Sequence, residues 1–144
     1  MEIDKNDLKI IEILKSNSNL TTSQISKKTG MPITTIHNRI KKLKNKGYIK
    51  NYTIKIDYEK LGKPLKAYIL ITVNQDAISQ SQIGKKILAL EGAESVDIVT
   101  GTTDIITQIR IKDMHLLNDF ITNHLRKIEG IDKTQTLMVL EEIN

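Results

Sequence analysis

Apolar residues recur at helical spacing near the start of the chain. Leu8, Ile11 and Leu14 follow one another at intervals of three residues, which places them on one side of a helix. Asp4 stands just before this run, where a short acidic side chain caps a helix N-terminus. The pattern predicts a first helix that ends near Lys15.

A second and a third helix are expected to follow. Thr21 and Gln24 have the spacing of a capping box, which predicts a helix over residues 22–29 that ends at Gly30. Pro32 suits the first turn of the next helix, because proline there loses no helical hydrogen bond. Two helices joined by so short a turn are typical of a helix–turn–helix.

The third helix has one apolar and one polar side. Its apolar residues repeat at intervals of three, four and three, and we expect them to face the other two helices: Ile33, Ile36, Ile40 and Leu43. At 100° per residue the opposite side carries Thr34, Asn38, Lys41 and Asn45, with Thr35 and Lys42 beside them. Arg39 falls at the edge of the apolar stripe, which favours a partly structural role.

Strand patterns begin after residue 50. Residues 51–57 alternate polar and apolar side chains and predict a strand, followed by a turn at residues 62–64. A lone strand is not stable in water, so it needs a partner. A symmetry-related copy of the chain is the simplest partner.

The remaining residues predict a duplicated unit. The expected order is a strand at 66–73, a helix at 79–90, strands at 95–100 and 104–111, a helix after Asp113, and a strand at 133–140. This β-α-β-β-α-β order is ferredoxin-like: a four-stranded antiparallel sheet with both helices on one face. Consecutive apolar residues such as Ile69, Leu70 and Ile71 predict that the other face is buried against a second subunit.

Charge separates the two halves of the chain. Residues 1–65 hold fourteen Lys and Arg against six Asp and Glu, whereas residues 66–144 hold eight against eleven. Between Ile13 and Ile56 there are ten basic residues and no acidic one. Clustered cations attract DNA phosphates, and a carboxylate on the same surface would be repelled. The plain alternative is a packing module whose polar side meets only water.

Other chemistry is not indicated. The chain has no Cys, which excludes disulfides and thiolate metal sites, and it has no run of about twenty apolar residues. Its first residues lack the pattern of a secretion signal. We expect a soluble cytoplasmic protein without a membrane partner, a metal or a cofactor.

The polar side of the third helix fits double-stranded DNA. Short hydrogen-bonding side chains near its start could approach base edges, and long cations further on could contact phosphates. Asn38 could pair with an adenine edge, while Lys41 and Lys42 would anchor. His37 could touch DNA or be a bystander. The candidate DNA-binding residues are Ser23, Thr34, Thr35, His37, Asn38, Arg39, Lys41 and Lys42.

The whole chain resembles the leucine-responsive/AsnC-type, or feast/famine, transcription regulators. The segments that carry the resemblance are residues 4–14, 30–49, 100–104 and 130–140. It implies an α+β protein with a winged-helix-like helix–turn–helix domain at 1–50, a linking strand and hinge at 51–65, and a ferredoxin-like domain at 66–144 that senses an effector and oligomerises. Met31-Pro32 and Thr103 depart from the family, which commonly has Leu-Ser and an aromatic residue there.

The resemblance also implies an effector site, a homodimer, and assembly to an octamer or a similar oligomer. An amino acid would bind beside the turn formed by Thr100, Gly101, Thr102, Thr103 and Asp104. The residue types are compatible, since Gly101 allows close approach, turn N–H groups could hold a carboxylate and Asp104 could accept from an ammonium. The alternative is a plain polar hairpin turn.

Two other functions remain open at this point. Siroheme decarboxylases resemble the same two-domain architecture, but His37, His115 and His124 are scattered, without metal-ligand spacing or a partnered nucleophile. We therefore expect no catalytic residues. A DNA-compacting protein with little sequence preference would differ from a regulator in its ratio of specific to non-specific affinity.

Overall fold

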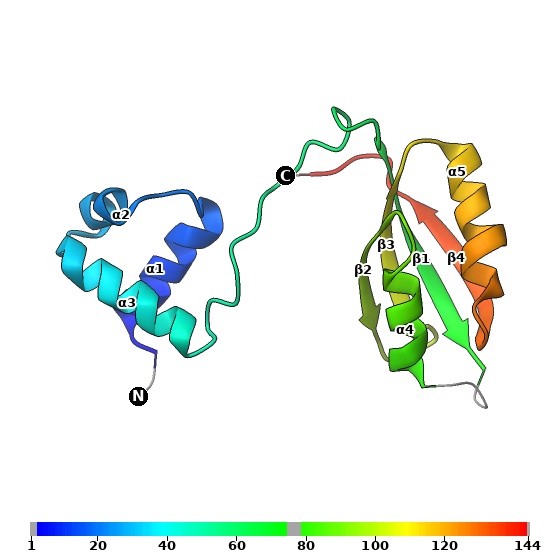
Figure 1. Cartoon of the computed structure of the whole chain (residues 1–144), viewed down its shortest axis with the longest axis horizontal. Helices are drawn as coiled ribbons and strands as arrows, with labels where there is room; N and C mark the ends of the chain where they lie inside the picture. The colour runs from blue at the N-terminus through cyan, green and yellow to red at the C-terminus, as the bar shows by residue number, and fades with distance from the viewer. Residues whose placement is uncertain (1–2, 75–78, 144) are drawn as a thin grey trace. The chain divides into compact units, whose positions relative to one another are not determined.

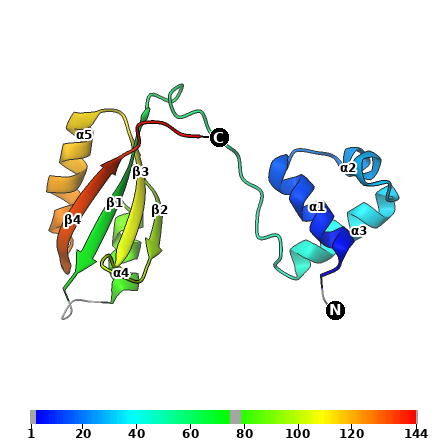
Figure 2. The same ribbon diagram turned by 180° about the vertical axis from the view of Figure 1, so that it is seen from behind.

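The computed structural model describes residues 3–74 and 79–143 and divides the chain into two compact units, Met1–Lys55 and Ile56–Asn144 (Figure 1). The N-terminal unit contains α1 (Lys5–Ser16), α2 (Thr22–Thr29) and α3 (Ile33–Asn45). Figure 2 shows these three helices from behind, with the turn that joins α2 to α3. Three helices in this order confirm the predicted helix–turn–helix.

Local hydrogen bonds set the ends of these helices as the sequence predicts. The Asp4 carboxylate accepts from the N–H of Asp7, and Thr21 and Gln24 form the expected capping box. Gly30 ends α2 with a φ of 75°, a conformation that costs glycine little. α3 has no side-chain cap, because Pro32 occupies the N-cap position.

The core of the N-terminal unit takes residues from all three helices, and its buried members are Ile10, Leu14, Ile25, Ile36 and Leu43. The prediction that Ile33 joins this core is wrong, since Ile33 is 50% exposed. Ile33 is the first residue of α3, so the neighbouring helices do not cover it as they cover Ile36.

No strand forms at residues 51–57 in the single chain. These residues have no regular secondary structure and their side chains are exposed. A strand needs a ladder partner, and among the described residues none pairs with this segment. The predicted linking strand is therefore not a feature of one chain by itself.

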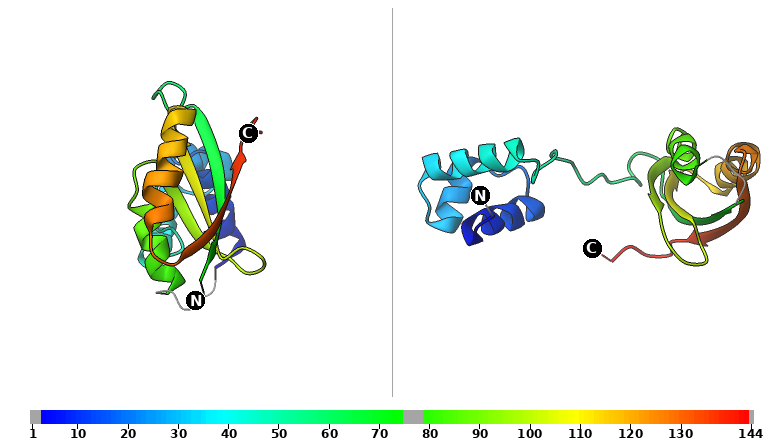
Figure 3. Two further views of the ribbon diagram at one scale, coloured as in Figure 1. Left: turned by 90° about the vertical axis from the view of Figure 1, so that its right-hand side faces the viewer. Right: turned by 90° about the horizontal axis from the view of Figure 1, so that it is seen from below.

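The C-terminal unit has the predicted ferredoxin-like arrangement. Its elements are β1 (Leu65–Val73), α4 (Gln80–Leu88), β2 (Ala93–Ile98), β3 (Ile105–Ile111), α5 (Met114–Asp119) and β4 (Ile131–Met138). The strands form one antiparallel sheet in the order β2-β3-β1-β4. Viewed end on, both helices lie on the same face of the sheet (Figure 3).

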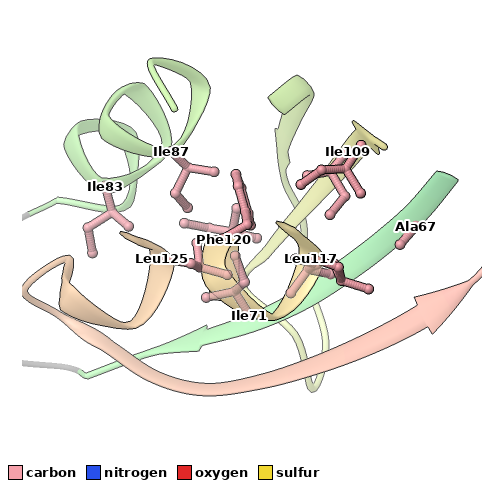
Figure 4. Packing of buried hydrophobic residues seen from close by; sticks show 11 residues of the cluster. Ala67, Ile71, Ile83, Ile87, Ile109, Leu117, Phe120 and Leu125 are labelled. Atoms are coloured by element: carbon pink, nitrogen blue, oxygen red, sulfur yellow. The ribbon is translucent and has the colours of Figure 1, made fainter. Parts of the chain in front are cut away.

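The core of this unit lies between the sheet and its two helices. Ile71 and Ile109 point from the strands toward Ile83 and Ile87 of α4 and toward Phe120 (Figure 4). Alternate strand residues face the other way. That second face carries half-exposed Tyr68 and Leu70, and no described helix of this unit covers it.

The last helical segment differs from the single helix predicted after Asp113. α5 ends at Asp119 and continues as a π turn (Phe120–His124) and a short 3-10 turn (Leu125–Lys127). Phe120 and Leu125 are both buried, yet five residues in a regular α-helix would separate them by about 140° around the axis. The wider π turn brings both onto the side that faces the sheet.

Candidate nucleic-acid interface and effector turn

The polar side of α3 is open to solvent. Thr34, His37, Asn38 and Lys41 are exposed, as Ser23 is in the first turn of α2. Thr35 and Lys42 are half-buried, so the exposed side is displaced from the predicted one toward Ile33 and His37. Hydrogen-bonding side chains and a cation therefore share one accessible helix surface, which is what a major-groove reader needs.

Arg39 forms ion pairs within the N-terminal unit. Its Nη1 lies 2.6 Å from Oδ2 of Asp4 and 2.7 Å from Oδ1 of Asp7. The Asp7 side chain is 1% exposed and the Arg39 side chain 24%. These hydrogen bonds raise the pKa of Arg39 above its ordinary value. The guanidinium therefore joins α3 to the start of α1, which is the partly structural role expected of Arg39. A contact between Arg39 and DNA stays a prediction.

The described acidic side chains at the start of the chain are all in ion pairs. Asp4 and Asp7 are paired with Arg39, and Glu12 lies 2.9 Å from the Lys15 ammonium. The exposed cations of α2 and α3 meet no carboxylate in their own segment, because residues 14–55 contain none. The exposed lysines Lys27, Lys28 and Lys41 therefore give α2 and α3 a surface of net positive charge.

The Asp4–Arg39 contact predicts a pH dependence. The hydrogen bond from Arg39 lowers the pKa of Asp4 below its ordinary value of 3.8. A carboxyl whose pKa is lower in the folded state stabilises the fold above its unfolded pKa, and this contribution is lost as the pH falls through the folded pKa. We expect the stability of the N-terminal unit to decrease from about pH 5 to about pH 2. Denaturation midpoints across this range should show a shallower decrease for Asp4→Asn; equal slopes would contradict the assignment.

The predicted effector turn lies between β2 and β3. Thr100, Gly101 and Thr102 are exposed, and Thr103 is half-buried. Gly101 has a φ of 123°, which L side chains rarely adopt, so a substitution there would strain the turn. This part of the turn is accessible to a small molecule.

Asp104 has internal partners that the sequence did not predict. Its Oδ2 accepts from the Val73 N–H at 2.9 Å, and its Oδ1 accepts from Gln80 Nε2 at 3.1 Å. Its own N–H donates to the Ile71 carbonyl at 3.0 Å. Asp104 therefore links the turn to the end of β1 and the start of α4 through hydrogen bonds. Both of its carboxylate oxygens are already hydrogen-bonded.

The sequence pattern does not predict one charged cluster of the C-terminal unit. Arg110 is 8% exposed, lies 4.6 Å from the Tyr58 ring centroid, and donates to Glu142, which also accepts from Lys66 at 2.9 Å. These contacts lower the pKa of Glu142. No local sequence pattern could have revealed them, because the partners are more than thirty residues apart.

Residues 3–74 and 79–143 contain neither a metal-binding cluster nor a membrane-spanning helix. No group of three His, Asp or Glu side chains is placed to hold a metal ion. No helix in that part of the chain is long and apolar enough to cross a membrane.

Known proteins match both units. Residues 3–50 match the family described as winged helix-turn-helix DNA-binding, and residues 66–144 match the Lrp/AsnC ligand binding domain. The HTH-type transcriptional regulator FL11 of Pyrococcus furiosus is 37% identical over 139 residues, which cover 96% of this chain and 90% of that protein.

Two solved structures share the arrangement of each unit. LrpC of B. subtilis has a TM-score of 0.86 at 26% identity, covering 100% of this chain and 99% of that one. A transcriptional regulator of Neisseria meningitidis, solved as a complex with L-Met, has a TM-score of 0.93 at 24% identity, covering 99% and 93%.

Proposed function

Because this chain belongs to the Lrp/AsnC family of helix–turn–helix transcriptional regulators, we propose that it binds a specific DNA site through α3. The supporting observation is the exposed side of α3, where Asn38 and Thr34 are available to bases and Lys41 to phosphates, in a segment (residues 14–55) that contains no Asp or Glu. The relatives are transcriptional regulators, and this family assignment separates the chain from the enzymes that resemble its two-domain architecture. A protein that acts on the chromosome would work in the cytoplasm.

Dimer formation would give two recognition helices. Among the described residues, no element of the C-terminal unit covers the sheet face that carries Tyr68 and Leu70, and no strand forms a ladder with residues 51–57. A second copy could supply both, as a symmetric interface uses the same surface twice. Recognition helices of such a dimer would enter successive major grooves about 34 Å apart. We propose further assembly of dimers to an octamer or a similar oligomer.

The effector would be an amino acid or a related small molecule. The accessible turn at residues 100–103 and the ligand-binding family of the C-terminal unit support this proposal. The bound L-Met of the Neisseria regulator is an example within this fold. An amino acid that binds one assembly state better than another would shift the assembly equilibrium, and with it the affinity for DNA.

Selection of bound fragments from random DNA by the full-length protein tests the proposal. The selection should be run at physiological salt, with and without a panel of amino acids. An enriched, roughly palindromic site supports a specific regulator, and an amino acid that changes its occupancy identifies the effector. Enrichment of nothing beyond bulk DNA would favour the DNA-compacting alternative.

Two variants of α3 should then separate base contacts from phosphate contacts. Asn38→Ala should weaken binding to the selected site about tenfold and relax preference at one base pair, because a bidentate contact is lost. Lys41→Ala should weaken binding to all sequences and lower the salt slope by about one. Lys85→Ala, an exposed lysine of α4, is the charge-matched control for titrations at several salt concentrations. Equal loss on every sequence in both α3 variants would contradict this division of roles.

A further inference from the structure

Ile33 is an exposed apolar residue on the side of α3 that is open to solvent. Half of its surface is accessible, although its side chain would be expected in a core. The core beneath α3 is completed without it, since Ile36 and Leu43 are fully buried. Ile33 and His37 are four residues apart on one helix, so their side chains are surface neighbours.

The first residues of α3 are apolar, whereas most helices begin with polar residues that cap the N-terminus. The N-cap residue is Pro32, which is exposed and provides no side-chain hydrogen bond. No acidic residue stands in the first turn. A surface that begins with Pro32 and Ile33 and continues with Thr34, Asn38 and Lys41 combines an apolar tip with hydrogen-bonding groups and a cation.

The DNA major groove offers one apolar group, the C5-methyl of thymine. The exposed side of α3 that carries Ile33 also carries the cation of Lys41, in a segment without Asp or Glu, and this charge favours a polyanionic partner over an ordinary apolar protein surface. We propose that Ile33 is a specificity-determining residue that contacts thymine methyl groups in the major groove. This inference rests on the proposed function and adds to it a preference for T at the position that Ile33 reaches.

Deoxyuridine substitution tests the contact without changing base pairing. Each thymine of the selected site is replaced in turn by deoxyuridine, which lacks only the methyl group, and the affinity of the full-length protein is measured. We expect the wild type to lose about three- to tenfold at one or two positions in each half-site, the size of one buried methyl contact. Ile33→Ala should lose a similar factor on the unmodified site and then be insensitive to deoxyuridine at those positions.

Two control variants test whether the loss of affinity comes from the methyl contact of Ile33. Ile33→Val retains an apolar side chain and should keep most of the methyl sensitivity. Leu88→Ala removes a similarly exposed residue, 51% accessible, from α4 and should behave as the wild type. Unchanged thermal unfolding of Ile33→Ala would show that the fold is intact, as its exposure predicts.

The experiments distinguish a failure of the Ile33 proposal from a failure of the proposed function. An enriched site whose affinity is indifferent to every thymine methyl would overturn the role of Ile33 while leaving the regulator in place. An Ile33→Ala protein as sensitive to deoxyuridine as the wild type would do the same. Failure to enrich any site would overturn the proposed function itself.

Discussion

Replacing Arg39 with methionine is expected to destabilise the N-terminal unit by about 3 kcal/mol, because it leaves a buried carboxylate without its partner. The Asp7 side chain is 1% exposed, and Arg39 Nη1 lies 2.7 Å from it. Methionine keeps much of the length of the arginine side chain, so the loss reflects charge more than packing. Native-state hydrogen exchange of the Ile36 and Leu43 amides would measure the change in the full-length protein.

Two further variants test the cause. Asp7→Asn combined with Arg39→Met removes the buried charge together with its partner, and should be more stable than Arg39→Met alone. Lys41→Met also removes one positive charge from α3, but from an exposed position, and should leave the exchange rates unchanged. A double variant as unstable as Arg39→Met would show that the guanidinium acts through packing and not through Asp7.

Arg39 is a basic residue of α3 whose guanidinium pairs with two carboxylates of the same unit. Its side chain joins α3 to the start of α1, and Asn38 is the residue before it on α3. Arg39→Met should therefore weaken specific and non-specific binding together once the unit begins to unfold. Lys41→Ala should change the salt slope without changing stability.

The elements that the sequence predicted correctly are those that depend on near neighbours. The capping box of Thr21 and Gln24 joins residues three apart, and both its hydrogen bonds are formed. The alternation in β1 puts Ala67, Ile69 and Ile71 on the covered side of the sheet. Such patterns determine which elements form and which side of each is buried.

The missed features depend on residues distant in the sequence or on a second chain. Arg39 and Asp7 are 32 residues apart, as are Arg110 and Glu142, so no local period reports either contact. Ile33 follows the apolar spacing of α3, but the other two helices do not cover its side chain. Residues 51–57 alternate like a strand, yet hydrogen-bonded pairing requires a partner that one chain does not provide.

The sequence predicts that Asp104 could accept a hydrogen bond from the ammonium of an effector beside the Gly101 turn. Its hydrogen bonds to the Val73 N–H and to Gln80 show a structural role first. Hydrogen bonds to a charged acceptor are among the stronger ones. The two roles make different predictions for two substitutions at the same position.

Asp104→Ala should destabilise the C-terminal unit by about 2 kcal/mol, because the Val73 N–H and the Gln80 amide lose their acceptor. Asp104→Asn keeps a carbonyl oxygen for Val73, and the Gln80 amide can turn to present its own oxygen to the new NH₂ group. Hydrogen exchange of the β1 and β3 amides should therefore be faster in Asp104→Ala and near wild-type in Asp104→Asn. If Asp104 also holds the ammonium of an effector, Asp104→Asn will lose the amino-acid response of DNA binding while remaining stable. If its role is structural alone, Asp104→Asn will keep that response.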